Sequence, residues 1–257
     1  MQKKEVCWNI TTRCNQGCKY CHRFLGLNDL SFGDNEKILQ NFIRDGITDI
    51  TWTGGEALLY PHIVDLVREA KENGIRNKLI TNGMILAENE ETREIFNYLD
   101  SITLSIDSTN DKINGDLGRG TEHFNHVHTI LEYLKNKNVK VNINTVVSRK
   151  NLDNLEELGN FLNNYNINLW RVFQFMPLRE TAEKNREIFE ISDQEFTNQK
   201  DVFKKFPNIN NVDYRQEKDM EDKYVLLVAN GDIIITENGK DVKKGNALYQ
   251  NIMQFMD

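Results

Sequence analysis

The sequence predicts an α/β fold, a partial (β/α)6 TIM-like barrel with a short C-terminal hairpin and helix extension. Three observations lead to this prediction. Six apolar, β-branched segments alternate with helix-like segments up to about residue 206. Each strand-like segment ends in polar or glycine-rich residues. After the first of these segments, three of the four cysteines lie within a stretch of eight residues. Repeated strand–helix units form parallel sheets, whose ligands bind at the carboxyl ends of the strands.

The predicted strands are short and rich in apolar or β-branched residues. They cover residues 6–12, 49–53, 78–81, 102–106, 139–147 and 169–175. Between them, apolar residues recur with helical spacing, as at Ile63, Leu66, Val67 and Ala70, where Asn73-Gly74 then ends the helix. Similar spacing predicts helices around residues 42–47, 95–99, 127–134 and 152–162.

The last fifty residues have a different pattern. Residues 224–228 and 232–236 are apolar and flank Asn230-Gly231, which predicts a β-hairpin. A short helical stretch is expected around Ile252. We therefore divide the chain into a barrel, residues 1–206, and an extension, residues 207–257, that we expect to cover the open side of the barrel.

Bulk properties limit the possible partners. The 257 residues carry a formal net charge of -7, so no general basic field attracts a nucleic acid polymer. No apolar run is long enough to span a bilayer, and the N-terminal residues lack the apolar core of a signal peptide. We expect a cytoplasmic protein without a membrane partner, in which clustered cysteines bind metal rather than form disulfides.

Cys14, Cys18 and Cys21 lie on one short loop after the first strand. Three thiolates can hold three irons of a [4Fe-4S] cluster and leave the fourth iron open for a ligand. Two alternatives stay open. A zinc site would use His22 as its fourth ligand, and a ferredoxin-like carrier would use Cys7, although its position in the middle of a strand favours a buried structural thiol.

The histidines give no further metal motif. Three of the five fall within residues 123–128, with a spacing that spreads them around a helix. We expect all five to lie on the surface: His22, His62, His123, His126 and His128.

The Cys-x3-Cys-x2-Cys loop after a first strand resembles the cluster loop of the radical S-adenosylmethionine (SAM) superfamily. This resemblance implies the same partial barrel, with a [4Fe-4S] cluster and SAM as cofactors. It also implies that the open iron binds the amino and carboxylate groups of SAM. An electron, expected from a flavodoxin or ferredoxin, then splits SAM and yields a 5′-deoxyadenosyl radical that takes a hydrogen atom from the substrate.

The resemblance also implies which residues contact SAM. Gly54-Gly55-Glu56, after the second strand, resembles the motif whose backbone meets the amino group of SAM, since glycine permits a close approach. Tyr20 matches a position at the adenine, and Ser105 and Arg119 match groups that hold the ribose or the carboxylate. Asn144 and Met176 match positions near the ribose and adenine.

Two kinds of relative indicate a nucleotide substrate. Residues 170–174, 118–120 and 191–196, together with Tyr224, resemble viperin-like enzymes, which dehydrate CTP. Residues 79–83 and 175–177 resemble the GTP-cyclising enzymes of molybdenum cofactor synthesis. Arg171, with Lys140 as a second candidate, is the expected phosphate contact. Both kinds of relative have a lysine where this chain has Asn142. Alternatives are modification of a peptide or other small metabolite and, in a different class, a non-catalytic iron-sulfur or zinc module.

Overall fold

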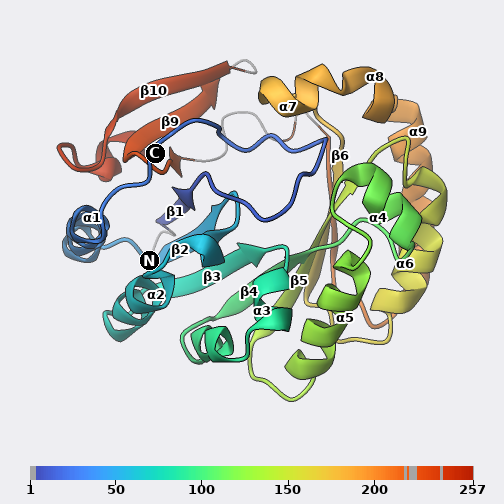
Figure 1. Ribbon diagram of the computed structural model, residues 1–257, viewed down its shortest axis with the longest axis horizontal. Coiled ribbons are helices and arrows are strands. Elements are labelled where there is room, and N and C mark those ends of the chain that lie inside the picture. Colours follow the sequence, from blue (N-terminus) through green and yellow to red (C-terminus); the bar gives the residue numbers. More distant parts are fainter. Residues whose placement is uncertain (1–3, 217–218, 220–224, 238–239, 257) are drawn as a thin grey trace.

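The computed structural model describes residues 4–216, 219, 225–237 and 240–256. In these residues one curved sheet forms the centre of the molecule, and helices cover its convex side (Figure 1). The strands of this sheet are β1 (Glu5–Thr11), β2 (Asp49–Gly54), β3 (Arg76–Thr81), β4 (Ser101–Ser105), β5 (Lys140–Val147), β6 (Leu169–Gln174), β7 (Val212–Arg215), β8 (Leu226–Leu227), β9 (Asp232–Glu237) and β10 (Lys240–Asn246).

The strands pair in the order β10-β9-β8-β1-β2-β3-β4-β5-β6-β7. Neighbouring strands from β1 to β7 run parallel, as repeated βα units require. In the described residues the two outer strands, β7 and β10, do not pair with each other, so the barrel is open. The predicted fold class is confirmed, and all six predicted strands are present.

The connections between the strands are mostly helical. The α-helices are α1 (Phe32–Asp45), α2 (Ile63–Glu72), α3 (Met84–Glu88), α4 (Asp111–Leu117), α5 (His123–Leu134), α6 (Leu155–Leu162), α7 (Arg179–Lys184), α8 (Arg186–Phe189) and α9 (Asp193–Asn198). Shorter 3-10 turns are η1 (Ala57–Leu59), η2 (Glu91–Asn97), η3 (Leu152–Asn154), η4 (Gln199–Lys205) and η6 (Ile252–Phe255).

A long connection, residues 12–31, separates β1 from α1 and carries the cysteine loop. Its end is set by Ser31, whose side chain accepts a hydrogen bond from the amide of Asp34 and caps α1. At the other end of the helix, Gly46 adopts φ 74°, a left-handed conformation that glycine reaches without strain. The loop is therefore held between a strand and a capped helix.

Successive residues of β1 face alternately the hydrophobic core and the barrel interior. Val6, Trp8 and Ile10 are at most 1% exposed and pack under the helices, and Trp8 stacks on Trp52 of β2 at 5.0 Å between ring centroids. Cys7 and Asn9 point the opposite way, into the barrel. The hydrophobic core thus lies between sheet and helices, whereas the barrel interior is left to polar side chains.

The C-terminal hairpin is confirmed over its described residues, since β8 and β9 pair antiparallel around Gly231, which has φ 83°. Tyr224 lies outside the described residues. The hairpin joins the sheet through β8, which runs parallel to β1, so it extends the β1 edge as well as standing beside the open side (Figure 1). A strand absent from the sequence prediction, β7, lies beyond residue 206 and pairs with β6. The domain boundary at 206 stays a prediction.

The helices are short compared with the thickness of a bilayer. Among the described residues none combines the length and the apolar character that crossing a membrane would require.

Candidate functional site

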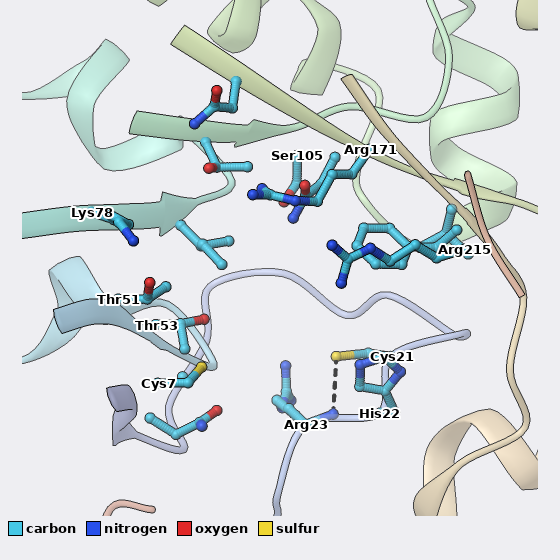
Figure 2. A pocket seen from close by; sticks show the side chains of 18 of the residues that line it. Cys7, Cys21, His22, Arg23, Thr51, Thr53, Lys78, Ser105, Arg171 and Arg215 are labelled. Atoms are coloured by element: carbon cyan, nitrogen blue, oxygen red, sulfur yellow. Dashed lines mark hydrogen bonds between the residues drawn. The ribbon is translucent and has the colours of Figure 1, made fainter. Parts of the chain in front are cut away.

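A cavity of about 680 Å³ lies inside the curved sheet. Its wall consists of inward-facing side chains of β1 to β9, together with residues of the cysteine loop and of the segment after β6. Figure 2 shows Cys21 and His22 on one side of this space and Ser105 and Arg171 on the other. The volume falls in the range of small-molecule sites. The cavity therefore meets the cysteine loop directly.

The three cysteines of the loop influence one another electrostatically. Burial raises the pKa of Cys18 to about 11, and the nearby sulfurs of Cys21 and Cys14 contribute to this increase. The amides of Gln16 and Arg23 point at the sulfurs of Cys14 and Cys21, at 3.5 and 3.4 Å. Backbone N–H groups aimed at sulfur are the contacts that stabilise cluster-bound thiolates. These observations fit a cluster held by the three sulfurs, with Cys21 lining the cavity.

The geometry required for a single ion is different. Within the described part of the chain, no three His, Cys, Asp or Glu side chains meet around one point as a single metal ion would require. In a cubane each thiolate binds its own iron atom. The ligand roles of Cys14, Cys18 and Cys21 stay a prediction.

The loop after α4 clamps the cysteine loop from one side. The amide of Gly17 donates to the carbonyl of Gly118 at 3.2 Å, and the amide of Lys19 donates to Leu117 at 3.0 Å. A Cβ atom on Gly118 would lie 2.3 Å from the carbonyl oxygen of Gly17. Only glycine fits there, which explains why a glycine precedes Arg119.

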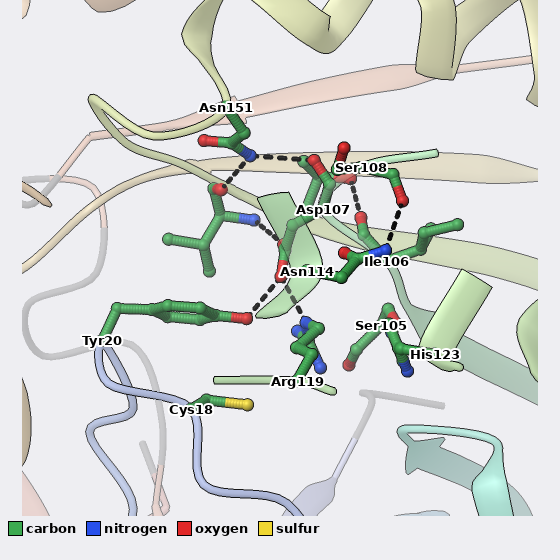
Figure 3. A network of polar contacts seen from close by, with 12 residues as sticks. Cys18, Tyr20, Ser105, Ile106, Asp107, Ser108, Asn114, Arg119, His123 and Asn151 are labelled. Carbon is green, nitrogen blue, oxygen red and sulfur yellow. Dashed lines mark hydrogen bonds and ion pairs between the residues drawn. The ribbon is translucent and has the colours of Figure 1, made fainter. Parts of the chain in front are cut away.

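Asp107, directly after β4, is the centre of a buried polar network (Figure 3). It accepts hydrogen bonds from the hydroxyl of Tyr20, from Nε of Arg119 and, at 2.7 Å, from the amide of Val146. Burial raises the pKa of Tyr20 well above its usual value, so the hydroxyl keeps its proton. Tyr20 and Arg119, both predicted SAM contacts, are thus brought together beside the cysteine loop, and both line the cavity.

The Gly54-Gly55-Glu56 motif has a packing role that the sequence did not predict. Cβ atoms on Gly54 and Gly55 would lie 2.3 Å from the carbonyl oxygen of Thr11 and 2.2 Å from that of Arg13. These glycines therefore let the end of β2 approach the start of the cysteine loop. Of the three motif residues, only Gly54 lines the cavity.

The side chain of Glu56 stabilises the local structure. Its carboxylate is 1% exposed and accepts hydrogen bonds from the amides of Leu58 and Asn82 and from the hydroxyl of Thr81. The side chain thus joins the end of β3 to the turn after β2 and does not face the cavity. Any contact of Glu56 with SAM would have to come from its backbone.

The remaining predicted SAM contacts share the cavity wall. Ser105, Asn144 and Met176 all line it, from β4, β5 and the segment after β6. The side-chain oxygens of Asn144 and Gln174 are buried there, and each lacks a hydrogen-bond partner among the described residues. Such acceptors on a cavity wall fit the donor groups of a nucleoside. Gln174 is an addition to the residues expected from sequence.

Four cations on the inward face belong to four different strands. Lys78 (β3) and Arg215 (β7) join the predicted Lys140 (β5) and Arg171 (β6) on the cavity wall. Lys78 pairs with Glu5 at 2.9 Å, and Arg215 pairs with Asp213 at 2.7 Å. Lys78 and Arg215 were missed because facing the interior depends on register. Arg215 also belongs to a strand that the sequence did not predict.

Three expectations about single residues were wrong. His22, expected on the surface, lines the cavity, and burial lowers its pKa to about 4. Cys7 is not a core thiol, since it faces the cavity between Thr51 and Leu226, although burial raises its pKa to about 12. His123 is not on the surface: it is 1% exposed and bonded to Gln16 and to the carbonyl of Ser105. An amphipathic helix shows which residues share a face, but a histidine on that face gives no signal of burial.

One arginine that lines the cavity joins three segments. Arg179, at the start of α7, donates to the carbonyl of His22 at 2.6 Å and holds Asp241 of β10 through two nitrogens, at 2.7 and 2.9 Å. Its guanidinium also lies 4.0 Å from the ring centroid of Phe24. Arg179 has φ 62°, unusual for a residue with a side chain. The cysteine loop, α7 and the C-terminal hairpin therefore meet at one guanidinium.

Comparison with known proteins identifies the superfamily to which this chain belongs and several similar proteins. The family model of the radical SAM superfamily matches residues 8–162. An S-adenosylmethionine-dependent nucleotide dehydratase from Flammeovirga pacifica is 30% identical over 250 residues, which cover 91% of this chain and 83% of that protein. A GTP 3′,8-cyclase from Limosilactobacillus fermentum is 28% identical over 202 residues, 73% of this chain and 59% of that one.

The fold has solved counterparts. Streptococcus suis SuiB bound to S-adenosylmethionine superimposes with a TM-score of 0.73 at 19% identity, covering 99% of this chain and 66% of that protein. The length of the relatives varies, since the chain spans only 48% and 57% of two other nucleotide dehydratases, from Lacinutrix mariniflava and Selenomonas ruminantium. The family match covers more than half of the chain, including the cysteine loop. This chain is a member of the radical SAM superfamily, whose enzymes use a [4Fe-4S] cluster and SAM.

Proposed function

We propose that this enzyme acts on a nucleoside triphosphate and removes water from it. Several relatives are named S-adenosylmethionine-dependent nucleotide dehydratases. One observation carries the proposal. Beside the cysteine loop lies a cavity whose lining strand residues include four cations, Lys78, Lys140, Arg171 and Arg215, and one acid, Glu5. Two further acids, Asp49 and Asp213, pair with Lys78 and with the two arginines, so among the described residues the cations still outnumber their acidic partners. A positively charged pocket with a hydroxyl- and amide-rich wall matches a ligand with phosphates at one end and a sugar and base at the other.

When bound, the cluster and SAM supply a 5′-deoxyadenosyl radical, which takes a hydrogen atom from a C–H bond. The chain's own residues decide which C–H bond is exposed to it. Arg171 and Arg215 lie on adjacent strands, where Asp213 contacts both at 3.9 and 2.7 Å and orients their guanidinium groups. Phosphate held at such fixed cations would keep the sugar in one position, which is the requirement for a selective radical reaction.

Both kinds of relative have a lysine where this chain has Asn142, so this position lacks a positive charge for binding phosphate. Other cations can supply that charge. Asn142 accepts a hydrogen bond from Asn168 at 2.8 Å and faces the cavity as a neutral group. Lys140 lies two residues earlier on the same face of β5, and it forms no ion pair with the residues that the structure describes. We propose that Lys140 and Arg215 provide the positive charge that Asn142 does not.

Location and partner belong to the same proposal. A low-potential cluster and free thiols require a reducing compartment, so we propose that the enzyme works in the cytoplasm. We also propose that a flavodoxin or ferredoxin supplies the electron.

The test uses anaerobically reconstituted protein with SAM, dithionite and one nucleoside triphosphate at a time, with 5′-deoxyadenosine as the readout. We expect one nucleotide to stimulate its release and to yield a product lighter by one water. Arg171→Ala should raise the KM for that nucleotide at least tenfold, whereas Lys37→Ala, on the outer face of α1, should not. If no nucleotide stimulates cleavage, the substrate is a peptide or another metabolite. If SAM is not cleaved and zinc is present in equal amount, the catalytic proposal is wrong.

A further inference from the structure

A chain of buried polar side chains connects β4 to the cysteine loop. Figure 3 shows three of its members, Ser105, His123 and Arg119, close to one another. Nε2 of His123 lies 2.8 Å from the carbonyl oxygen of Ser105, and Nδ1 lies 3.0 Å from the amide nitrogen of Gln16. Nη1 of Arg119 in turn donates to the amide oxygen of Gln16 at 3.2 Å. His123 and Gln16 are 1% and 8% exposed. Solvent therefore offers these groups no alternative partners.

We call this chain, which runs from Ser105 through His123 and Gln16 to Arg119, the relay. The direction of each of its hydrogen bonds follows from the carbonyl group of Ser105. The oxygen of Ser105 can only accept, so Nε2 of His123 carries the hydrogen. Burial and the charge of Arg119 lower the pKa of His123 well below its usual value, so the ring is neutral and Nδ1 is an acceptor. Gln16 must then donate through its amide nitrogen. Its amide oxygen is left to face the guanidinium of Arg119.

The guanidinium of Arg119 is held on two sides. Nε donates to Asp107 and Nη1 to Gln16, while Nη2 has no hydrogen-bond partner in the part of the chain that the structure describes. The side chain is 7% exposed and borders the cavity. A guanidinium fixed in this way can present its third nitrogen to a carboxylate without first losing rotational freedom.

We propose that His123 and Gln16 are positioning residues, which orient Arg119 to bind the carboxylate of SAM. This inference rests on the proposed function, because it needs SAM in the cavity. Neither residue has to touch SAM. Without His123 the amide of Gln16 can rotate by half a turn, which would direct its NH2 group at the NH2 of Arg119 and push the guanidinium out of place.

The experiment compares two ligands on the reconstituted holoenzyme: SAM and decarboxylated SAM, which has the same sulfonium and adenosine but no carboxylate. His123→Phe keeps the volume of the ring and removes both hydrogen bonds. We expect the dissociation constant for SAM to rise about tenfold, while that for decarboxylated SAM stays within about twofold of wild type. His123→Gln, which can donate to Ser105 and accept from Gln16, should recover part of the loss. His128→Phe, half exposed on the same helix, is the matched control.

Other readouts separate positioning from a structural role. Adding His123→Phe to an Arg119→Met variant should change SAM affinity no further, because the relay acts only through Arg119. In the apo-protein, nitrogen NMR should find the hydrogen of His123 on Nε2. If His123→Phe fails to fold, Gln16→Met replaces it, with iron content as the check on the cluster.

Three results would overturn the inference: equal loss of affinity for both ligands, no loss of affinity for either ligand, or the hydrogen on Nδ1. Wild-type protein that binds neither ligand would instead contradict the proposed function itself.

Discussion

The four cysteines of this chain have the same chemistry but different surroundings. Cys14, Cys18 and Cys21 share one loop, whereas Cys7 stands alone on β1 inside the barrel. We expect Cys18→Ser to lose most of its iron after anaerobic reconstitution, because two thiolates cannot hold a cubane. Cys7→Ser should keep wild-type iron content and the same cluster absorption spectrum. Equal iron loss in both variants would contradict the assignment of the loop.

Asp49 makes a testable contribution to stability. Its carboxylate is 1% exposed and lies 2.7 Å from Arg76 and 2.8 Å from Lys78. Burial opposes ionisation, but hydrogen bonds from Lys78 and Arg76 lower the pKa of Asp49 below its usual 3.8. A carboxyl whose pKa is depressed in the folded state stabilises the protein above its unfolded pKa, and this contribution is lost as the pH falls through the folded value.

We therefore expect Asp49→Asn to lower the free energy of unfolding at pH 7 by about 2 kcal/mol, less than for a fully buried pair since both cations are partly exposed. The difference from wild type should shrink below about pH 4. Urea unfolding at pH 7 and pH 3 measures both values. A difference that does not depend on pH would show that the charge of Asp49 contributes nothing.

At the scale of single residues, the sequence identified those whose role depends on spacing. The three cysteines and Tyr20 follow from one loop motif. Asp107 and His123 do not, because their importance comes from burial and from partners that lie far away in the sequence. Lys78 was missed for a related reason, since inward and outward residues of a strand are distinguished only by what packs on each side.

Among the elements, the close backbone contact between the residues that follow β1 and β2 can be tested by one substitution. In Gly55→Ala the new methyl group would lie 2.2 Å from the backbone oxygen of Arg13, so the cysteine loop would have to move. We expect the apo-protein to lose about 2 kcal/mol or more of stability and to take up less iron. Thermal unfolding and iron analysis measure these effects.

Gly33→Ala is the control for that variant, since no atom lies within 4 Å of the added carbon and the site is in helix α1. It should be neutral or slightly stabilising. Normal iron uptake by Gly55→Ala would show that the loop tolerates the displacement.

Elements with strong periodicity were predicted well, whereas β7 and β10 were not predicted. The six strands of the βα units and the hairpin around Gly231 each have an apolar run or a turn signal. β7, with the sequence Val212-Asp213-Tyr214-Arg215, has neither. It forms because β6 offers an unpaired edge beside it, which is a tertiary condition that no local pattern can reveal.

For the molecule as a whole, the C-terminal fifth of the chain, residues 207–257, extends the sheet at both edges. Removing residues 207–257 would uncover the edges of β6 and β1 and one wall of the cavity. Exposed parallel edges promote association between chains. We expect the truncated protein to elute as aggregates in size-exclusion chromatography and to unfold without a cooperative transition. A monomeric product with the thermal midpoint of the full chain would show that residues 207–257 are a dispensable appendage.

The meeting of three segments at Arg179 has a consequence for how such an enzyme changes its specificity during evolution. The chemistry resides at the cysteine loop, while an ion pair between Arg179 and Asp241 joins the two flanks of the open sheet in the described residues. Lengthening or shortening either flank would alter which molecules fit, and the radical-generating half would stay intact. An unclosed barrel whose flanks are joined by side-chain contacts thus lets descendants acquire new substrates without rebuilding their most oxygen-sensitive part.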